Sequence, residues 1–137
     1  MDMSMVNRCR AKGHDIEHMD GLSYLQARQD SSLGGIFAAQ VVEHLANDDF
    51  TSFLRLSRLK LRPGGLLIFE TVNPHSIEAF KTFWTDLTHM RPIFPEVALA
   101  WCWLSGFERA EVLFPNGVHD LEEDRRTQGE YSVIATR

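Results

Sequence analysis

Side chains that could transfer protons or bind a polar ligand gather in three short stretches of this 137-residue chain. Two stretches directly follow apolar runs at 36–39 and 66–69, and the third lies at 84–92. Their members are Gln40, Glu43 and His44, then Glu70, Asn73 and His75, then Asp86, Thr88, His89 and Arg91. An imidazole titrates near neutral pH, so His75 and His89 are candidates for a general base that deprotonates an acceptor hydroxyl.

Each of these assignments has a structural alternative. Asp86, His89 and Arg91 could instead tie down a long loop through mutual hydrogen bonds. His44 could be a packed helix residue, and Glu43 could favour the positive end of a helix. The residue types alone leave both interpretations open.

Metal and thiol chemistry have little support in the sequence. Glu43 and His44 alone are too few ligands for a divalent cation. His14 and His18 have a spacing that suits zinc only on a helix, whereas the extended chain expected there places them ~13 Å apart. Cys9 belongs to no CxxC pattern, and reduced thiols in a cytosolic protein are the simplest account. We predict no metal site.

Apolar periodicity predicts the elements that must position these residues. Strands are expected at 14–19, 36–39, 66–69, 107–114 and 131–136, and helices at 22–27, from Asn47 or Asp48, from Ser76 and from Pro95. Pro63-Gly64-Gly65 should end the second of these helices, and the polar segment 116–129 should be a loop. The compact apolar runs at 36–39 and 66–69 are typical of parallel strands buried on both faces.

Alternating strands and helices predict an α/β fold with a mostly parallel sheet that ends in an antiparallel hairpin. In such sheets ligands bind beyond the carboxyl ends of the strands. This rule adds Asp20, which follows the first expected strand, to the candidates. It could equally cap the helix that begins near Leu22.

Composition limits the classes of function. A length of 137 residues fits one domain, spanning 1–137. The net charge of −5, without a run of Lys or Arg, argues against nucleic-acid binding. No stretch approaches the ~20 apolar residues that cross a bilayer, and the first five residues do not form a signal peptide. We therefore expect a cytoplasmic protein without a membrane partner.

Two segments resemble a known family. The run Ile36-Phe37-Ala38-Ala39-Gln40-Val41-Val42-Glu43-His44-Leu45 and the run Leu61-Arg62-Pro63-Gly64-Gly65-Leu66-Leu67-Ile68-Phe69-Glu70 resemble the fourth and fifth strands of class I S-adenosylmethionine-dependent methyltransferases. Segments of that family often read "hEHL" and "LKPGGxLhhxxPN". The resemblance covers nearly all of the chain and implies a Rossmann-like three-layer sandwich that transfers a methyl group from S-adenosylmethionine. The pair "NPHS" and "FWxDxTHxRP" is similar to a bacterial subgroup associated with sugar pathways, which implies a small-molecule or saccharide acceptor.

The resemblance also implies roles for individual residues. Asp20 and Gly21 match the place that meets the adenine ring, and Gln40 and His44 border the sulfonium. Related ubiquinone methyltransferases hold a metal with ExxEH, where this chain has Gln40 in the first position. The residues expected to bind the acceptor are Glu70, Asn73, Asp86 and Arg91. Asp2 could grip the ribose hydroxyls, or else belong to a terminus or a helix cap.

The first strand of that family, its glycine-rich cofactor turn and its second strand have no counterpart here. Gly34-Gly35 cannot replace the turn, because these residues enter a strand, whereas cofactor-cradling glycines follow one. We therefore expect a truncated methyltransferase domain with weakened cofactor binding, whose exposed sheet edge is closed by rearrangement or by a second copy in a homodimer. The alternative is a non-catalytic remnant that acts as an interaction or oligomerisation module.

Overall fold

A mixed sheet of four strands forms the centre of the computed structural model, which describes residues 3–115 and 121–137. The strands are β1 (Leu33–Ala39), β2 (Leu61–Val72), β3 (Arg109–Leu113) and β4 (Glu130–Thr136), in the order β1-β2-β4-β3. β1 and β2 pair in parallel, with Ile36 opposite Leu67. β4 is antiparallel to both β2 and β3. The predicted α/β fold and the antiparallel final pair are confirmed, with β4 inserted between β2 and β3.

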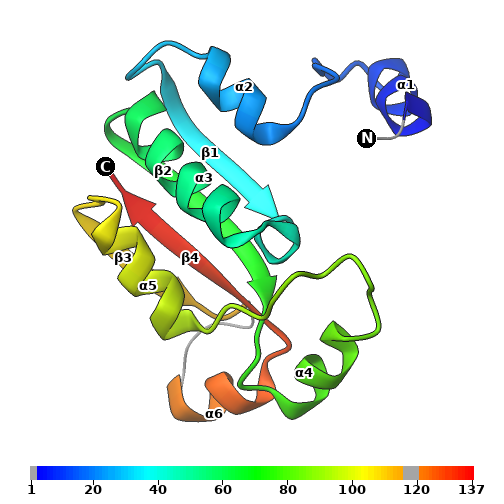
Figure 1. Ribbon diagram of the computed structural model, residues 1–137, viewed down its shortest axis with the longest axis vertical. Coiled ribbons are helices and arrows are strands. Elements are labelled where there is room, and N and C mark those ends of the chain that lie inside the picture. The colour runs from blue at the N-terminus through cyan, green and yellow to red at the C-terminus, as the bar shows by residue number, and fades with distance from the viewer. Residues whose placement is uncertain (1–2, 116–120) are drawn as a thin grey trace.

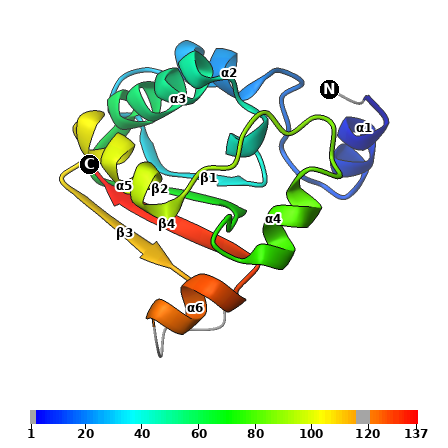
Figure 2. The ribbon, with the colours of Figure 1, turned by 60° about the horizontal axis from the view of Figure 1, so that its bottom comes forward.

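Three helices cover one face of this sheet (Figure 2). They are α2 (Gly21–Ala27), α3 (Asn47–Lys60) and α5 (Pro95–Leu104). Phe50 of α3 is fully buried and meets Phe69 of β2 edge to face, with ring centroids 6.1 Å apart. Burial of such a side chain contributes about 1.5–3 kcal/mol, so this layer holds the fold together.

The remaining helices lie around the sheet. They are α1 (Met3–Ala11), the 3-10 turn η1 (Val42–His44), α4 (Ile77–Phe83) and α6 (Leu121–Thr127). α4 and α6 lie at the end of the sheet where β1 and β2 end (Figure 1). No helix of the described residues is long and apolar enough to cross a membrane.

The opposite face of the sheet is not covered by α2, α3 or α5 (Figure 2). Leu67 and Phe69 point toward those helices and are fully buried, whereas Leu66 is 39% exposed. On the same open face, Phe37 of β1 is 68% exposed. The expectation that these strands are buried on both faces is therefore wrong, since each strand buries only one side.

Two element boundaries differ from the prediction. Ala46 occupies the N-cap position of α3 without a side-chain hydrogen bond, so neither Asn47 nor Asp48 caps it. The helix ends at Lys60 and the chain passes directly into β2. Pro63-Gly64-Gly65 therefore lies inside β2 and does not end the helix, because Leu61 has already adopted an extended conformation.

Two other segments were predicted incorrectly. Residues 14–19 form no strand, since the described strands pair only with one another and leave the outer edge of β1 without a partner. The segment between the last two strands contains α6 as well as loop, while positions 116–120 lie outside the described residues. The helix at 22–27 is confirmed.

The helix predicted from Ser76 is confirmed, with the Ser76 Oγ accepting a hydrogen bond from the Ala79 amide. The apolar residues of this helix nevertheless mostly face solvent: Ile77 is 73% and Trp84 is 55% exposed, whereas Phe83 is buried. The helix after Pro95 is confirmed as well. Helical spacing identified these helices but not the faces that they bury.

Candidate functional site

The polar ends of β1 and β2 meet at Gln40. Its backbone N–H donates to the carbonyl of Glu70 over 2.9 Å. Its side-chain Nε2 donates to Glu130 Oε1 over 3.2 Å. Gln40 has a φ of +53°, which turns the chain out of the sheet and into η1. As the strand-end rule predicts, the two polar exits lie side by side.

The turn η1 places Glu43 in the interior, where its side chain is fully buried. Its Oε2 accepts a hydrogen bond of 2.9 Å from the hydroxyl of Thr71, which is buried on β2. Its Oε1 is buried without a hydrogen-bond partner. Glu43 thus presents a carboxylate oxygen that the surrounding described residues do not satisfy.

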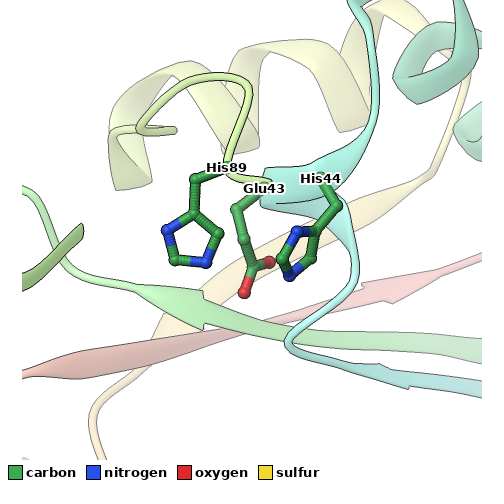
Figure 3. Close-up of side chains that lie close together, drawn as sticks. All are labelled: Glu43, His44 and His89. Atoms are coloured by element: carbon green, nitrogen blue, oxygen red, sulfur yellow. The ribbon is translucent and has the colours of Figure 1, made fainter. Parts of the chain in front are cut away.

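The structure brings His44 close to His89 and Asp86, which lie far from it in the sequence but only three residues from each other. The imidazole rings of His44 and His89 have centroids 4.7 Å apart (Figure 3). Asp86 Oδ1 accepts from the Thr88 hydroxyl at 2.6 Å and from its amide at 2.8 Å. These bonds hold the pKa of Asp86 below its ordinary value. Asp86 and Thr88 thus tie the loop down, without the mutual hydrogen bonds of Asp86, His89 and Arg91 that were the structural alternative, and the ring of His89 lies beside that of His44 in η1.

His75 belongs to a different hydrogen-bond network. Its Nε2 lies 3.0 Å from both carboxylate oxygens of Glu96. Glu96 also forms an ion pair of 2.9 Å with Arg125. Burial acts to raise the pKa of Glu96, but the hydrogen bond to His75 and the nearby charges outweigh it, and the pKa is lowered. Glu96 is not among the residues predicted from the sequence. The sequence feature that could have indicated it is a carboxylate in the first turn of the helix after Pro95.

Two of the predicted acceptor-binding residues are largely enclosed. Asn73 is fully buried and uses both amide hydrogens, donating to the carbonyls of Arg125 and Gln128 at 2.8 Å each. The guanidinium of Arg91 lies 5.6 Å from the centre of the Phe50 ring. Its Nε and Nη2 are buried without a hydrogen-bond partner. Asn73 therefore orders the chain before β4, while Arg91 keeps unsatisfied donors.

A cavity of about 650 Å³ lies between α2, β1 and α3. Its lining is mainly apolar, with Asp20 and Gly21 among the residues that border it. Asp20 caps α2, and its Oδ1 accepts from the Ser23 amide at 2.9 Å. Hydrogen bonding to Ser23 lowers the pKa of Asp20, so the carboxylate is ionised at neutral pH. Asp20 therefore caps α2 and also borders the cavity, so the two roles are compatible.

The described residues fit S-adenosylmethionine in part. The apolar cavity walls, which include Leu22, Ile36 and Ala38, suit an adenine ring, and Asp20 offers an acceptor for its amino group. The methionine half would need a glycine turn that follows a strand and opens a helix. Within 3–115 and 121–137, Gly34 and Gly35 instead lie inside β1. Asp2, the candidate for the ribose hydroxyls, lies outside the described residues.

The chain was compared with family models, with curated proteins and with solved structures. No family model matches the chain, and no curated protein matches its sequence. Solved structures do match. A methyltransferase of Archaeoglobus fulgidus that depends on S-adenosylmethionine superposes with a TM-score of 0.86 at 22% identity, over 99% of this chain and 73% of that one. A second, from Mesorhizobium loti, has a TM-score of 0.69 at 20% identity, over 99% and 77%.

A third match is the methyltransferase in a complex with the Haloferax volcanii Trm112 methyltransferase activator, with a TM-score of 0.70 at 17% identity, over 98% of this chain and 68% of that one. At these identities the likeness concerns the fold. The sheet order and the parallel β1–β2 pair, with β4 antiparallel between β2 and β3, agree with it. The chain therefore has a partial Rossmann-like fold of the class I S-adenosylmethionine-dependent methyltransferases.

Proposed function

We propose that this protein transfers a methyl group from S-adenosylmethionine to a small-molecule or saccharide hydroxyl. The observation that carries the proposal is the meeting of the β1 and β2 ends at Gln40 and Glu70, in a methyltransferase fold with a cavity beside β1. In parallel α/β sheets this edge is where ligands bind. A cytoplasmic location remains part of this proposal.

In this proposal, Asp20 and Gly21 bind the adenine end of the cofactor, and Gln40 and His44 border its sulfonium. The cofactor supplies an activated methyl group, so the protein mainly has to orient the acceptor. The acceptor would contact Glu70, Asp86 and Arg91, while the fully buried Asn73 would support this site by ordering the chain before β4. The rate of methyl transfer depends mainly on how the acceptor is aligned with the methyl group, because a misplacement of ~1 Å can lower the rate ~100-fold.

The proton of the acceptor hydroxyl would be taken by His89 or His75. Nδ1 of His89 lies 2.8 Å from the Phe83 carbonyl, which can only accept, so Nδ1 carries the hydrogen and Nε2 is free to accept a proton. His75 is held against Glu96, an arrangement that orients an imidazole base. The two histidines are alternatives, and substitution of each by Gln separates them by the loss of turnover.

The test is calorimetry with S-adenosylhomocysteine, comparing the wild-type chain with Asp20→Ser. Serine can still cap α2 but has no carboxylate for the adenine amino group. The proposal expects measurable binding by the wild-type chain and about tenfold or greater weakening in the variant. No heat at millimolar ligand would rule out autonomous methyl transfer by this chain.

A second function, that of an interaction module, is favoured by the free edge of β1. The cavity runs along Gly35–Ala39, and the open face exposes Phe37. An unpaired strand edge is a template for another strand, which a second copy of this chain would supply. Sedimentation should then show a dimer that Phe37→Lys dissociates, while Ile77→Lys, a change at an equally exposed apolar residue of α4, has no effect. A wild-type monomer would contradict this module.

A further inference from the structure

We propose that Glu43, His44 and His89 form a binding site for a divalent transition metal ion of the Zn²⁺ type. One ligand atom from each residue lies within 4.8 Å of the others, among the residues that the structure describes. In Figure 3 the Glu43 carboxylate extends toward the two imidazole rings. The site goes beyond methyl transfer and does not depend on cofactor binding. Because it takes up the Nε2 lone pair of His89, it leaves His75 as the base of the proposed methyl transfer.

Glu43 supplies the first reason. It is fully buried, and its Oε1 has no hydrogen-bond partner. A buried carboxylate that lacks a partner is costly, whereas coordination of a cation satisfies it. Thr71 donates to the other oxygen over 2.9 Å and so fixes the plane of the carboxylate. The unpaired oxygen is therefore held in place beside two possible nitrogen ligands.

The hydrogen bonds of the two histidines supply the second reason. His89 has its Nδ1 hydrogen committed to the Phe83 carbonyl, which leaves the Nε2 lone pair for a metal. Thr88 gives its single hydroxyl hydrogen to Asp86 at 2.6 Å, so its contact of 3.0 Å with His44 must run from Nδ1–H to the hydroxyl oxygen. His44 likewise presents the lone pair of Nε2.

This arrangement matches the outer shell of known metal sites. Ligating histidines usually donate their other N–H to a carbonyl, a carboxylate or another acceptor, which fixes the ring orientation. His89 is further held against Phe83, with ring centroids 4.4 Å apart. Asp86 Oδ2 lies 3.8 Å from His89 Nε2 and adds negative charge beside the site. Positioning and charge thus both favour a cation.

The ligand types select the class of metal. Two imidazoles and one carboxylate suit Zn²⁺ and its neighbours, whereas Mg²⁺ and Ca²⁺ prefer oxygen ligands. Bonds of about 2.0–2.1 Å would bring the three ligand atoms to roughly 3.4 Å from one another, so small side-chain rotations must close the site. Three protein ligands leave a position for water or for an oxygen of a bound molecule.

The experiment is a calorimetric titration of the chelator-treated full chain with Zn²⁺, and separately with Mg²⁺. We expect one equivalent of Zn²⁺ to bind and Mg²⁺ to give no heat. His44→Gln and His89→Gln should each weaken Zn²⁺ binding by at least about 10–100-fold, the range already seen when outer-shell partners are removed. The matched control is His18→Gln, at an exposed histidine in the irregular segment 14–19, which should leave the affinity unchanged.

Circular dichroism of each variant establishes that it is folded. If His89→Gln fails to fold, Glu43→Gln takes its place, and Co²⁺ absorption of the wild-type chain reports directly on nitrogen coordination. Absence of Zn²⁺ binding by the wild-type chain would overturn the site. Equal weakening by His18→Gln, or none by the ligand variants, would also overturn it. Binding of S-adenosylhomocysteine is measured separately, so the two proposals can fail independently.

Discussion

Gln40 donates its backbone N–H to the carbonyl of Glu70 over 2.9 Å, which ties the end of β1 to β2 where both strands leave the sheet. Gln40 makes this bond with a φ of +53°, in a region that favours glycine. This junction sets where the two polar segments leave the sheet.

The backbone of Gln40 gives the first prediction. Gln40→Val should destabilise the fold by about 1–2 kcal/mol, because a β-branched residue is strained at a positive φ. Gln40→Gly loses the same side-chain bond to Glu130 but relieves the backbone strain. Denaturant unfolding of both variants checks this, and equal stability of Gln40→Val and Gln40→Gly would contradict it.

Asp20 gives the second prediction, which separates its two roles. Asp20→Ala should cost about 1 kcal/mol of unfolding free energy through loss of the α2 cap, whereas Asp20→Ser should cost much less. Thermal unfolding of the two variants measures the cap alone. If Asp20→Ala is as stable as the wild-type chain, then Asp20 does not act as a cap in solution.

Thr71 gives the third prediction. Thr71→Val keeps the shape of the side chain but removes the hydrogen bond that the Glu43 carboxylate accepts within the described structure, so about 1–3 kcal/mol of stability should be lost. The control is Thr51→Val on α3, where the hydroxyl donates to the Asn47 carbonyl of its own helix and the change should stay within about 0.5 kcal/mol. Equal effects in urea unfolding would argue against the buried bond.

The Glu96 network gives a prediction about pH. The pKa of Glu96 is lowered in the folded state, so its contribution to stability is present above the ordinary value of 4.5 and is lost as the pH falls through the lowered pKa. The melting temperature of Glu96→Gln should therefore lie below that of the wild-type chain at neutral pH, and the two should converge in acid. Glu111→Gln, at an exposed carboxylate of β3, is the control, and a constant gap for Glu96→Gln across pH would be the contrary result.

The sequence predicted the strands at 36–39 and 66–69 because compact apolar runs between turn residues have few other solutions. It also predicted that these two strands would lie side by side with their polar ends together. It could not show that one sheet face is open, since burial on one or both faces depends on which helices cover the sheet. The fold is partial, and the role of each predicted site residue remains a prediction.

The proximity of Glu43 and His89 could not be predicted from the sequence, for a related reason. Spacing identifies ligands on one helix or strand, but His89 reaches η1 through a loop whose path is set by the bonds of Thr88 and Asp86. The sequence identifies Glu43 and His44 as neighbours, but two residues are too few ligands for a metal. His89, the third candidate ligand, became visible only with the tertiary structure.

The most direct test of the account is a nuclear magnetic resonance titration of the labelled chain with S-adenosylhomocysteine. Binding at the proposed cofactor site should change the amide shifts mainly at Asp20 and Gly21, at the start of α2, and at 36–41 around the end of β1. Absence of any change at millimolar ligand, or changes centred on β3 and α6, would contradict a cofactor site at the β1 edge.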